Sequence, residues 1–174
     1  KRMNTEITKQ SIARYQVTEP HVTNLPVTDS SNSGMALLQA VGNTPLLPLR
    51  RVSEGLSTHV KVYAKAEWFN PGGSVKDRPA FNIIRSAVND CQLLPGMRLL
   101  DSTSGNMGIA YATFGAALDI PVTLVLPDNV SPERIAILRA LGAELVLTDP
   151  LEGSDGSIQV ARQMAEKNPE LYFY

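Results

Sequence analysis

Apolar and polar positions alternate between strand-like and helix-like patterns from residue 59 onward. Apolar residues alternate or run together, as in strands, over 59–67, 98–102, 121–126, 143–148 and 171–174. Apolar residues at i, i+3, i+4 and i+7 spacing, as in helices, lie between them over 76–93, 104–117, 131–141 and 157–167. This order predicts an α/β fold with a parallel sheet and helices packed on it.

Residues that favour helix ends support these boundaries. Pro79 has no N–H and fits the first turn of a helix, so that helix should begin near Lys76 or Asp77. Ser131 followed by a proline is typical of an N-cap. Gly142 is expected to end the same helix in the left-handed conformation.

The first part of the chain follows no such period. Residues 1–34 are rich in Thr, Ser, Asn and Gln, and we expect a mobile extension there. A short helix is predicted from Met35, then a turn at 42–45 and a short apolar strand at 46–49. His59 is expected to begin the next strand.

Composition narrows the classes of partner. The chain has 174 residues, of which 43% are hydrophobic, enough for one domain or two small lobes with a core. Sixteen basic residues against seventeen acidic ones give a net charge of -1, which argues against a nucleic acid or an acidic membrane as the main partner. Without a long apolar run, no segment is expected to cross a membrane.

The single cysteine and the two histidines carry little chemistry. Cys91 has no partner for an intrachain disulfide, and we expect it to be buried on the apolar face of the helix predicted at 76–93. His21 and His59 lack the spacing of metal ligands, so no metal site is expected. A reducing, cytoplasmic setting is the corresponding prediction.

The first candidate for a functional residue is a lysine in a glycine-rich turn. Residues 70–78 read Asn-Pro-Gly-Gly-Ser-Val-Lys-Asp-Arg, so Lys76 lies where a helix begins. The helix dipole disfavours a charged amine there, and a neutral amine is the form that makes a Schiff base with an aldehyde. Arg78 either steadies the helix start or faces an anion. Trp68 and Phe69 are expected to pack in the core beneath the turn.

A second polar turn follows the strand predicted at 98–102. Residues 103–108 read Thr-Ser-Gly-Asn-Met-Gly and open the next helix, so free N–H groups should point outward. Thr103 and Ser104 add hydroxyls, and Asn106 adds a donor and an acceptor. This set suits a carboxylate or a phosphate, although such residues also form ordinary capped turns. Because both turns follow predicted strands, we expect both at the carboxyl edge of the sheet.

Taken in order, these segments resemble the cysteine synthase family, pyridoxal-phosphate enzymes of fold type II. The resemblance covers about residues 35–174 and rests on Gly-Asn-Thr-Pro-Leu at 42–46, Lys-Ala-Glu at 65–67, the lysine turn at 70–78, Thr-Ser-Gly-Asn at 103–106 and a later run from Pro127 to Glu144. It implies a three-layer αβα architecture like that of tryptophan synthase β, with pyridoxal 5'-phosphate as cofactor.

The resemblance also implies residue roles. Lys76 would form the Schiff base with the cofactor and later take the substrate α-proton, and Asn106 would hydrogen-bond the cofactor's ring hydroxyl oxygen. The substrate carboxylate would be held by Thr103, Ser104, and the backbone of Gly105, Asn106 and Met107. The implied reaction is β-replacement, in which O-acetylserine or O-phosphoserine loses its β-group and sulfide adds to give L-cysteine.

The chain departs from the family in two respects. The family usually has threonine where Met107 stands, so one hydroxyl contact to the substrate is lost. Family members also continue for about as long again, so the chain is expected to be an N-terminal portion and, alone, an incomplete enzyme. On this basis residues 1–34 are an extension, 35–58 belong to the larger lobe, 59–150 form the smaller lobe, and 151–174 begin the larger lobe. A homodimer is implied as well.

Several readings of the function stay open. A cystathionine β-synthase would use the same two turns with a different nucleophile. A threonine dehydratase-like lyase is a further relative, although such enzymes tend to have Phe-Lys and Arg-Gly around the lysine, whereas here Val75 precedes Lys76 and Pro79 follows Arg78. A non-catalytic binding module is the alternative from a different class.

Overall fold

The computed structural model describes residues 33–174. The extension predicted at 1–34 therefore lies outside the described residues, except for its last two positions. These two belong to the first described helix, Ser33–Gln39 (α2).

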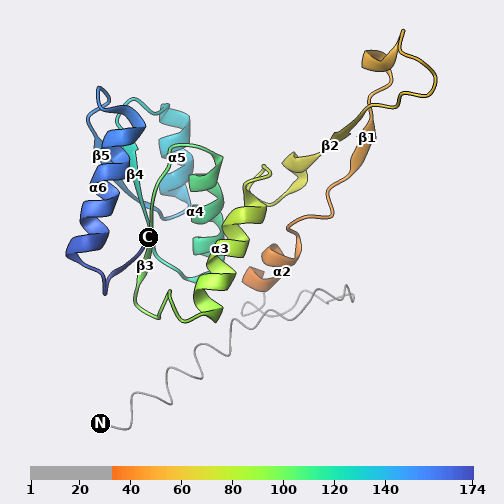
Figure 1. Cartoon of the computed structure of the whole chain (residues 1–174). Helices are drawn as coiled ribbons and strands as arrows, with labels where there is room; N and C mark the ends of the chain where they lie inside the picture. Colours follow the sequence, from red (N-terminus) through yellow and green to blue (C-terminus); the bar gives the residue numbers. More distant parts are fainter. Residues whose placement is uncertain (1–32) are drawn as a thin grey trace.

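A four-stranded parallel sheet lies at the centre of the body (Figure 1). In space the order of its strands is β5-β4-β3-β6, and each neighbouring pair is parallel. The strands are Arg98–Ser102 (β3), Val122–Pro127 (β4), Glu144–Thr148 (β5) and Tyr172–Phe173 (β6). The predicted α/β fold with a parallel sheet is confirmed, and each of these strands begins at its predicted start or next to it.

Helices cover both faces of this sheet, giving three layers (Figure 1). On one face Asn106–Leu118 (α4) packs on β4, and α4 is flanked by Asp77–Asn89 (α3), Pro132–Ala140 (α5) and α2. On the other face Gly153–Lys167 (α6) packs across β3, β4 and β5. The helix start predicted near Lys76 or Asp77 is confirmed.

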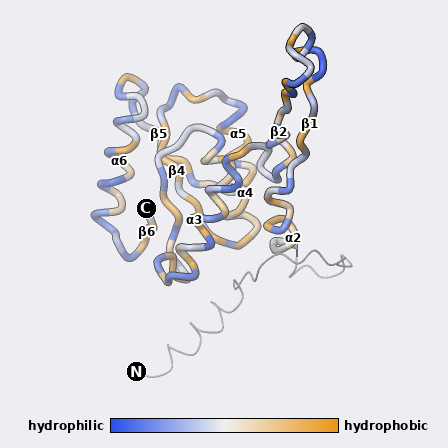
Figure 2. Tube along the Cα trace, turned by 45° about the vertical axis from the view of Figure 1, so that its right-hand side comes forward, coloured by the Kyte–Doolittle hydropathy of each residue, from blue (hydrophilic) through white to orange (hydrophobic). Residues whose placement is uncertain are grey.

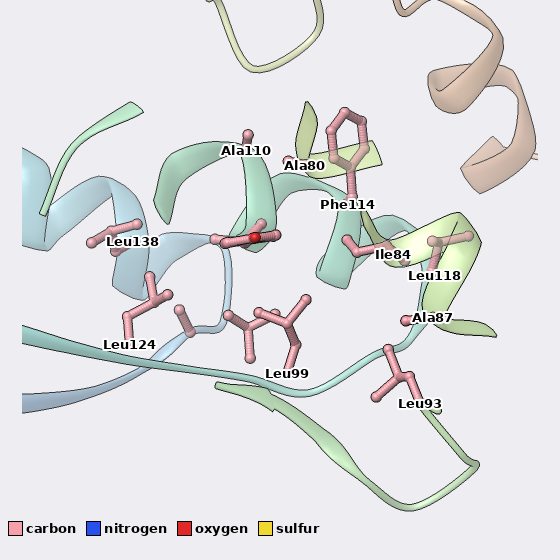
Figure 3. Close-up of a cluster of buried hydrophobic side chains, with 14 of the residues drawn as sticks. Ala80, Ile84, Ala87, Leu93, Leu99, Ala110, Phe114, Leu118, Leu124 and Leu138 are labelled. Carbon is pink, nitrogen blue, oxygen red and sulfur yellow. The ribbon is translucent and has the colours of Figure 1, made fainter. Parts of the chain in front are cut away.

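Two hydrophobic cores lie between the three layers. In the larger one, Ile84 of α3, Leu99 of β3, Phe114 of α4 and Leu124 of β4 converge (Figure 3). The smaller core lies under α6 and includes Leu100 of β3. Successive side chains of a strand point to opposite faces, so adjacent leucines on β3 serve different cores. Figure 2 shows the apolar stretch along β4, all six residues of which are buried.

The predicted start and end of α5 are both confirmed. Ser131 is its N-cap, and the Ser131 hydroxyl accepts a hydrogen bond from the backbone N–H of Arg134. Gly142 follows the helix with φ 80°, the left-handed value that glycine adopts without steric cost. The helix predicted at 157–167 begins four residues earlier, at Gly153 (α6).

The prediction of a buried Cys91 is wrong. Helix α3 ends at Asn89, and Cys91 is exposed with φ 56°. The chain leaves the helix in this left-handed residue, and the backbone N–H of Leu93 then bonds to the carbonyl of Ala87 at 3.0 Å. Leu93, which is 5% exposed, therefore fills the apolar position that the helical pattern assigned to Cys91.

The strand predicted at 59–67 is shorter than expected and does not join the parallel sheet. Strand Tyr63–Lys65 (β2) pairs antiparallel with Leu46–Pro48 (β1) in a separate two-stranded sheet. His59 lies in a turn before β2, so its predicted place at a strand start is wrong. The β1–β2 arm carries a 3-10 turn at Arg51–Ser53 (η1), projects from the body (Figure 1), and is polar at its tip (Figure 2).

Candidate active site

The two turns singled out in the sequence lie at the starts of neighbouring helices. Helix α4 follows β3 and so begins at the carboxyl end of that strand, whereas α3 ends where the chain turns into β3. The starts of α3 and α4 therefore lie at the same edge of the sheet, at the upper end of Figure 1, and the two helices pack on each other. Lys76 directly precedes α3, and Asn106 is the first residue of α4.

This edge also contains the point where the strand order reverses. From β3 the chain adds β4 and β5 on one side and then returns to place β6 on the other side of β3. Ligands of open parallel sheets bind outside the carboxyl ends of the strands at such a point. The asparagine turn, residues 103–108, follows directly on β3.

The lysine turn, residues 70–78, leaves its lysine side chain free. Lys76 is exposed, and between 33 and 174 no residue forms a hydrogen bond or an ion pair with its amine. Its backbone N–H donates to Ser74 Oγ at 3.1 Å, and Gly73 N–H donates to the carbonyl of Asn70 at 2.8 Å. Gly73 has φ 80°, a value that glycine adopts without steric cost.

A buried carboxyl group supports the turn from inside. Asp77 is completely buried, and its Oδ2 accepts a hydrogen bond from the backbone N–H of Gly72. Its Oδ1 has no hydrogen-bond partner in the described part of the chain. Burial, and to a smaller extent the nearby charge of Glu67, raise the pKa of Asp77, although the hydrogen bond from Gly72 acts in the opposite direction.

Arg78 faces a carboxylate of this chain. Its guanidinium forms an ion pair with Glu67, with Nε 2.8 Å from Oε2. Hydrogen bonds from Arg78 and Thr44 lower the pKa of Glu67 to about 2. Of the two roles left open for Arg78, the structure shows the contact that steadies the helix start.

The asparagine turn is held mainly by its backbone. Gly105 N–H donates to Thr103 Oγ1 at 3.3 Å, and Gly108 N–H donates to the carbonyl of Gly105 at 3.1 Å. Within the described residues the N–H groups of Asn106 and Met107 donate to no acceptor. The Asn106 side chain is exposed, and no described residue forms a hydrogen bond with it. Two free donors at the positive end of a helix suit a carboxylate.

Ser104 and Met107 have further neighbours. The carbonyl of Ser104 accepts a hydrogen bond from Arg134 Nη1 at 3.0 Å, which ties the asparagine turn to α5. Met107 is half-buried and packs against the larger core. Its side chain therefore contributes to packing.

A hollow of about 530 Å³ lies beside Ser104 at the same edge. Its lining includes Pro127 at the end of β4, Ser131 and Arg134 at the start of α5, and Gly153 at the start of α6. No sequence motif predicted a shared role for the residues that line this hollow. The signal in the sequence was a helix N-cap, Ser131, soon after a completely buried strand.

The prediction that Trp68 and Phe69 pack in the core is wrong. They are 58% and 60% exposed and lie in the 3-10 turn Glu67–Phe69 (η2). The buried positions of this segment are Ala66 and Asn70, which flank η2, so the aromatic residues between them face outward. The described residues contain no group of three His, Cys, Asp or Glu side chains placed to hold a metal ion, and no helix among them is long and apolar enough to cross a membrane.

Comparison with known proteins identifies the family. The model of the family described as pyridoxal-phosphate dependent enzyme matches residues 37–174. The chain belongs to this family. The family model thus includes both the lysine turn and the asparagine turn, and the cofactor of the family is pyridoxal phosphate.

Similar proteins carry the name cysteine synthase. The Aquifex aeolicus (strain VF5) cysteine synthase is 50% identical over 139 residues, which are 79% of this chain and 42% of that protein. Cysteine synthase B of Escherichia coli (strain K12) is 43% identical over 75% of this chain and 43% of its own length. The chain thus spans less than half of the length of these relatives.

Solved structures agree with the fold type. Cysteine synthase from Entamoeba histolytica superposes with a TM-score of 0.77 and 37% identity, covering 90% of this chain and 46% of that one. The O-acetylserine-dependent cystathionine β-synthase from Helicobacter pylori superposes with a TM-score of 0.72 and 30% identity, covering 86% and 46%. The expected fold type II architecture is confirmed by these neighbours.

The residues at the sheet edge fit the family's cofactor. An aldehyde needs an amine that is not committed elsewhere, and the amine of Lys76 has no partner among residues 33–174. Glycines at 72 and 73 keep side chains away from the turn next to that amine. The amide of Asn106, exposed and without a contact in the described structure, is available to a ring oxygen.

Proposed function

We propose that this chain is part of a cysteine synthase, which replaces the β-substituent of an activated serine with sulfide to form L-cysteine. The observation that carries the proposal is the placement of a free lysine amine and two free backbone N–H groups at one edge of the sheet, at the starts of α3 and α4. The names of the relatives that are 43–50% identical support the same reaction.

In this proposal each site residue has a task. Pyridoxal phosphate, when bound, supplies the electron sink that makes the α-hydrogen of the amino acid acidic. Lys76 Nζ holds the cofactor and then accepts the proton from the substrate α-carbon. The Asn106 side-chain amide orients the cofactor ring through its hydroxyl oxygen.

The substrate carboxylate binds at the start of α4. The hydroxyls of Thr103 and Ser104 and the backbone of Gly105, Asn106 and Met107 surround it. Because Gly105 N–H already donates to Thr103 Oγ1, the free N–H groups of Asn106 and Met107 are the main backbone donors. The positive end of the helix dipole adds to the attraction.

A second candidate function differs from the first in its nucleophile, and the leaving group of the substrate is also open. The likeness to an O-acetylserine-dependent cystathionine β-synthase favours a variant in which a thiol larger than sulfide attacks. Turnover of O-acetylserine and of O-phosphoserine, each with sulfide and with homocysteine, separates these readings. Faster turnover with homocysteine than with sulfide would favour the second candidate.

The deciding experiment replaces the lysine. In the full-length protein, Lys76→Ala should lower cysteine formation by about 10³-fold, because one group both holds the cofactor and moves the proton. Borohydride reduction with pyridoxal phosphate, followed by peptide mass spectrometry, should label Lys76 in the wild type. Lys61→Ala is the matched control, since Lys61 is exposed and has no contact within the described structure. Undiminished cysteine formation by Lys76→Ala would refute the proposal.

The cellular location and the oligomeric state of the protein belong to the same proposal. Resemblance to the cysteine synthase family implies a cytoplasmic homodimer. Light scattering of the full-length protein measures the oligomeric state.

A further inference from the structure

Glu67 is the centre of a hydrogen-bond cluster that joins three separate segments. Its Oε1 accepts from Thr44 Oγ1 at 2.8 Å, and its Oε2 accepts from Asn70 Nδ2 at 2.9 Å. Arg78 donates to both oxygens, from Nε at 2.8 Å and from Nη2 at 2.9 Å. One carboxylate thus receives hydrogen bonds from three side chains, and the contact with Arg78 is bidentate, the geometry that fixes a guanidinium most firmly.

The cluster holds both ends of the lysine turn. Asn70, at the start of the turn, is 3% exposed, and its carbonyl accepts the N–H of Gly73 at 2.8 Å. Arg78, at the end of the turn, lies in the first turn of α3, two residues after Lys76. Lys76 therefore lies between two residues that are bound to the same carboxylate.

A glycine in a third segment makes room for this arrangement. Gly42 has φ 91°, and its N–H donates to Asn70 Oδ1 at 2.9 Å. A Cβ at this position would lie 3.0 Å from Arg78 Nη1. The guanidinium thus occupies space that a side chain at residue 42 would take. The space at Gly42 is thus a second determinant of the position of the Arg78 guanidinium, and it does not depend on the charge of Glu67.

We propose that Glu67 is a positioning residue, which fixes Asn70 and Arg78 and thereby directs the amine of Lys76 toward the asparagine turn. The proposal rests on the proposed role of Lys76. A lysine has a flexible four-carbon side chain, so its amine is placed only if the backbone at its base is fixed. The described residues give the Lys76 amine no partner, so the backbone of the turn carries this task.

The test compares two variants that loosen the turn by different means. Glu67→Gln replaces an acceptor by an amide donor that faces Arg78, and Gly42→Ala displaces the guanidinium without changing any charge. Both should speed hydrogen exchange of the backbone amides at 72–78 by about tenfold in the cofactor-free full-length protein. Both should lower kcat by about tenfold and change KM for the activated serine by less than about twofold, because the carboxylate site lies on α4.

Each variant has a matched control. Glu144→Gln removes a carboxylate that pairs with Arg98 at 2.7 Å on the sheet, away from both turns. Gly55→Ala adds a methyl group at a glycine with φ 88° and no atom within 4 Å. Both controls should match the wild type in exchange at 72–78 and in kcat.

Three outcomes decide between the hypotheses. The positioning role is overturned if exchange at 72–78 stays at the wild-type rate in both Glu67→Gln and Gly42→Ala. It is also overturned if exchange rises but kcat falls no further than in Glu144→Gln, since the contacts would then be merely structural. If borohydride with pyridoxal phosphate fails to label Lys76 in the wild type, the proposed function fails instead, and the exchange rates still measure whether Glu67 fixes the turn.

Discussion

The lysine turn and the asparagine turn occupy equivalent places, each at the start of a helix at one edge of the sheet. Side chains hold the lysine turn, through the hydrogen bonds of Glu67 outside it and of Asp77 inside it. Backbone groups hold most of the asparagine turn, where Gly108 N–H bonds to the carbonyl of Gly105. The first arrangement fixes the base of one reactive side chain, and the second leaves donors free for a ligand.

The two turns also differ in their charged groups. Two carboxyl groups hold the lysine turn, and their pKa shifts are opposite, because Glu67 beside the turn is surrounded by donors and Asp77 within it is buried with one oxygen unpaired. The asparagine turn, 103–108, has no ionisable side chain, and its attraction for an anion comes from N–H groups and the helix dipole. Changes in the two turns should therefore have different consequences.

The largest effect that we expect at the asparagine turn separates activity from stability there. Asn106→Ala removes an exposed side chain that forms no hydrogen bond in the described structure, so the melting temperature should stay within about 1 °C of the wild type. Turnover of the activated serine should fall by about 10²-fold, because a hydrogen bond to the cofactor is lost. Steady-state kinetics and thermal unfolding measure the two effects. A melting temperature lower by several degrees would show that the side chain supports the turn after all.

The next effect compares alanine in the two turns. A Cβ at Gly72 would lie 2.6 Å from the buried Oδ1 of Asp77, so Gly72→Ala should lower the free energy of unfolding by about 1–3 kcal/mol. A Cβ at Gly105 would meet nothing within 4 Å, so Gly105→Ala should cost less than about 1 kcal/mol. Urea unfolding of both variants measures the difference. Equal losses would contradict the contrast between the turns.

The two carboxyl groups that hold the lysine turn, Glu67 and Asp77, should give opposite pH dependences. The pKa of Glu67 is lowered from 4.5 to about 2, so its contribution to stability is complete above pH 4.5 and is lost as the pH falls toward 2. The pKa of Asp77 is raised above its ordinary 3.8 by burial, so its contribution is complete below that value and is lost as the pH rises.

Urea unfolding across pH tests these signs. Glu67→Gln should have a lower free energy of unfolding than the wild type above pH 4.5. This difference should disappear as the pH falls from 4.5 to 2. Asp77→Asn should gain stability on the wild type as the pH rises above 3.8, the ordinary pKa of the group. Asp128→Asn, at an exposed position, is the control and should track the wild type. Parallel curves for Glu67→Gln and Asp77→Asn would contradict the assignment of opposite shifts.

The smallest effect concerns the methionine of the asparagine turn. Met107→Thr exchanges a half-buried side chain packed on the larger core for a hydroxyl. One added hydrogen bond of about 0.5–1.5 kcal/mol should lower KM for the activated serine by about 2- to 10-fold. The lost packing should lower stability by about 1 kcal/mol. An unchanged KM would mean that the hydroxyl does not reach the substrate carboxylate.

Local patterns of apolar, capping and turn residues determined most of the order of strands and helices. The apolar run at 121–126 predicted a strand buried on both faces, and Ser131 with the following proline predicted a helix start. The two turns, at 70–78 and 103–108, were likewise visible, because glycine, proline and a short polar sequence restrict the backbone within a few residues. The candidate lysine and asparagine were thus named from the sequence alone.

The tertiary structure decided what each of these residues contacts. The contacts of Glu67 with Thr44 and Arg78 join residues 23 and 11 positions apart, and no local pattern encodes such pairs. The same holds for exposure, since Cys91 and Trp68 lie in segments whose apolar positions are filled by other residues. Backbone preferences act over a few residues, so the sequence determined the elements and turns. Burial and charge pairing depend on which segments meet in space, and only the packed fold settles that.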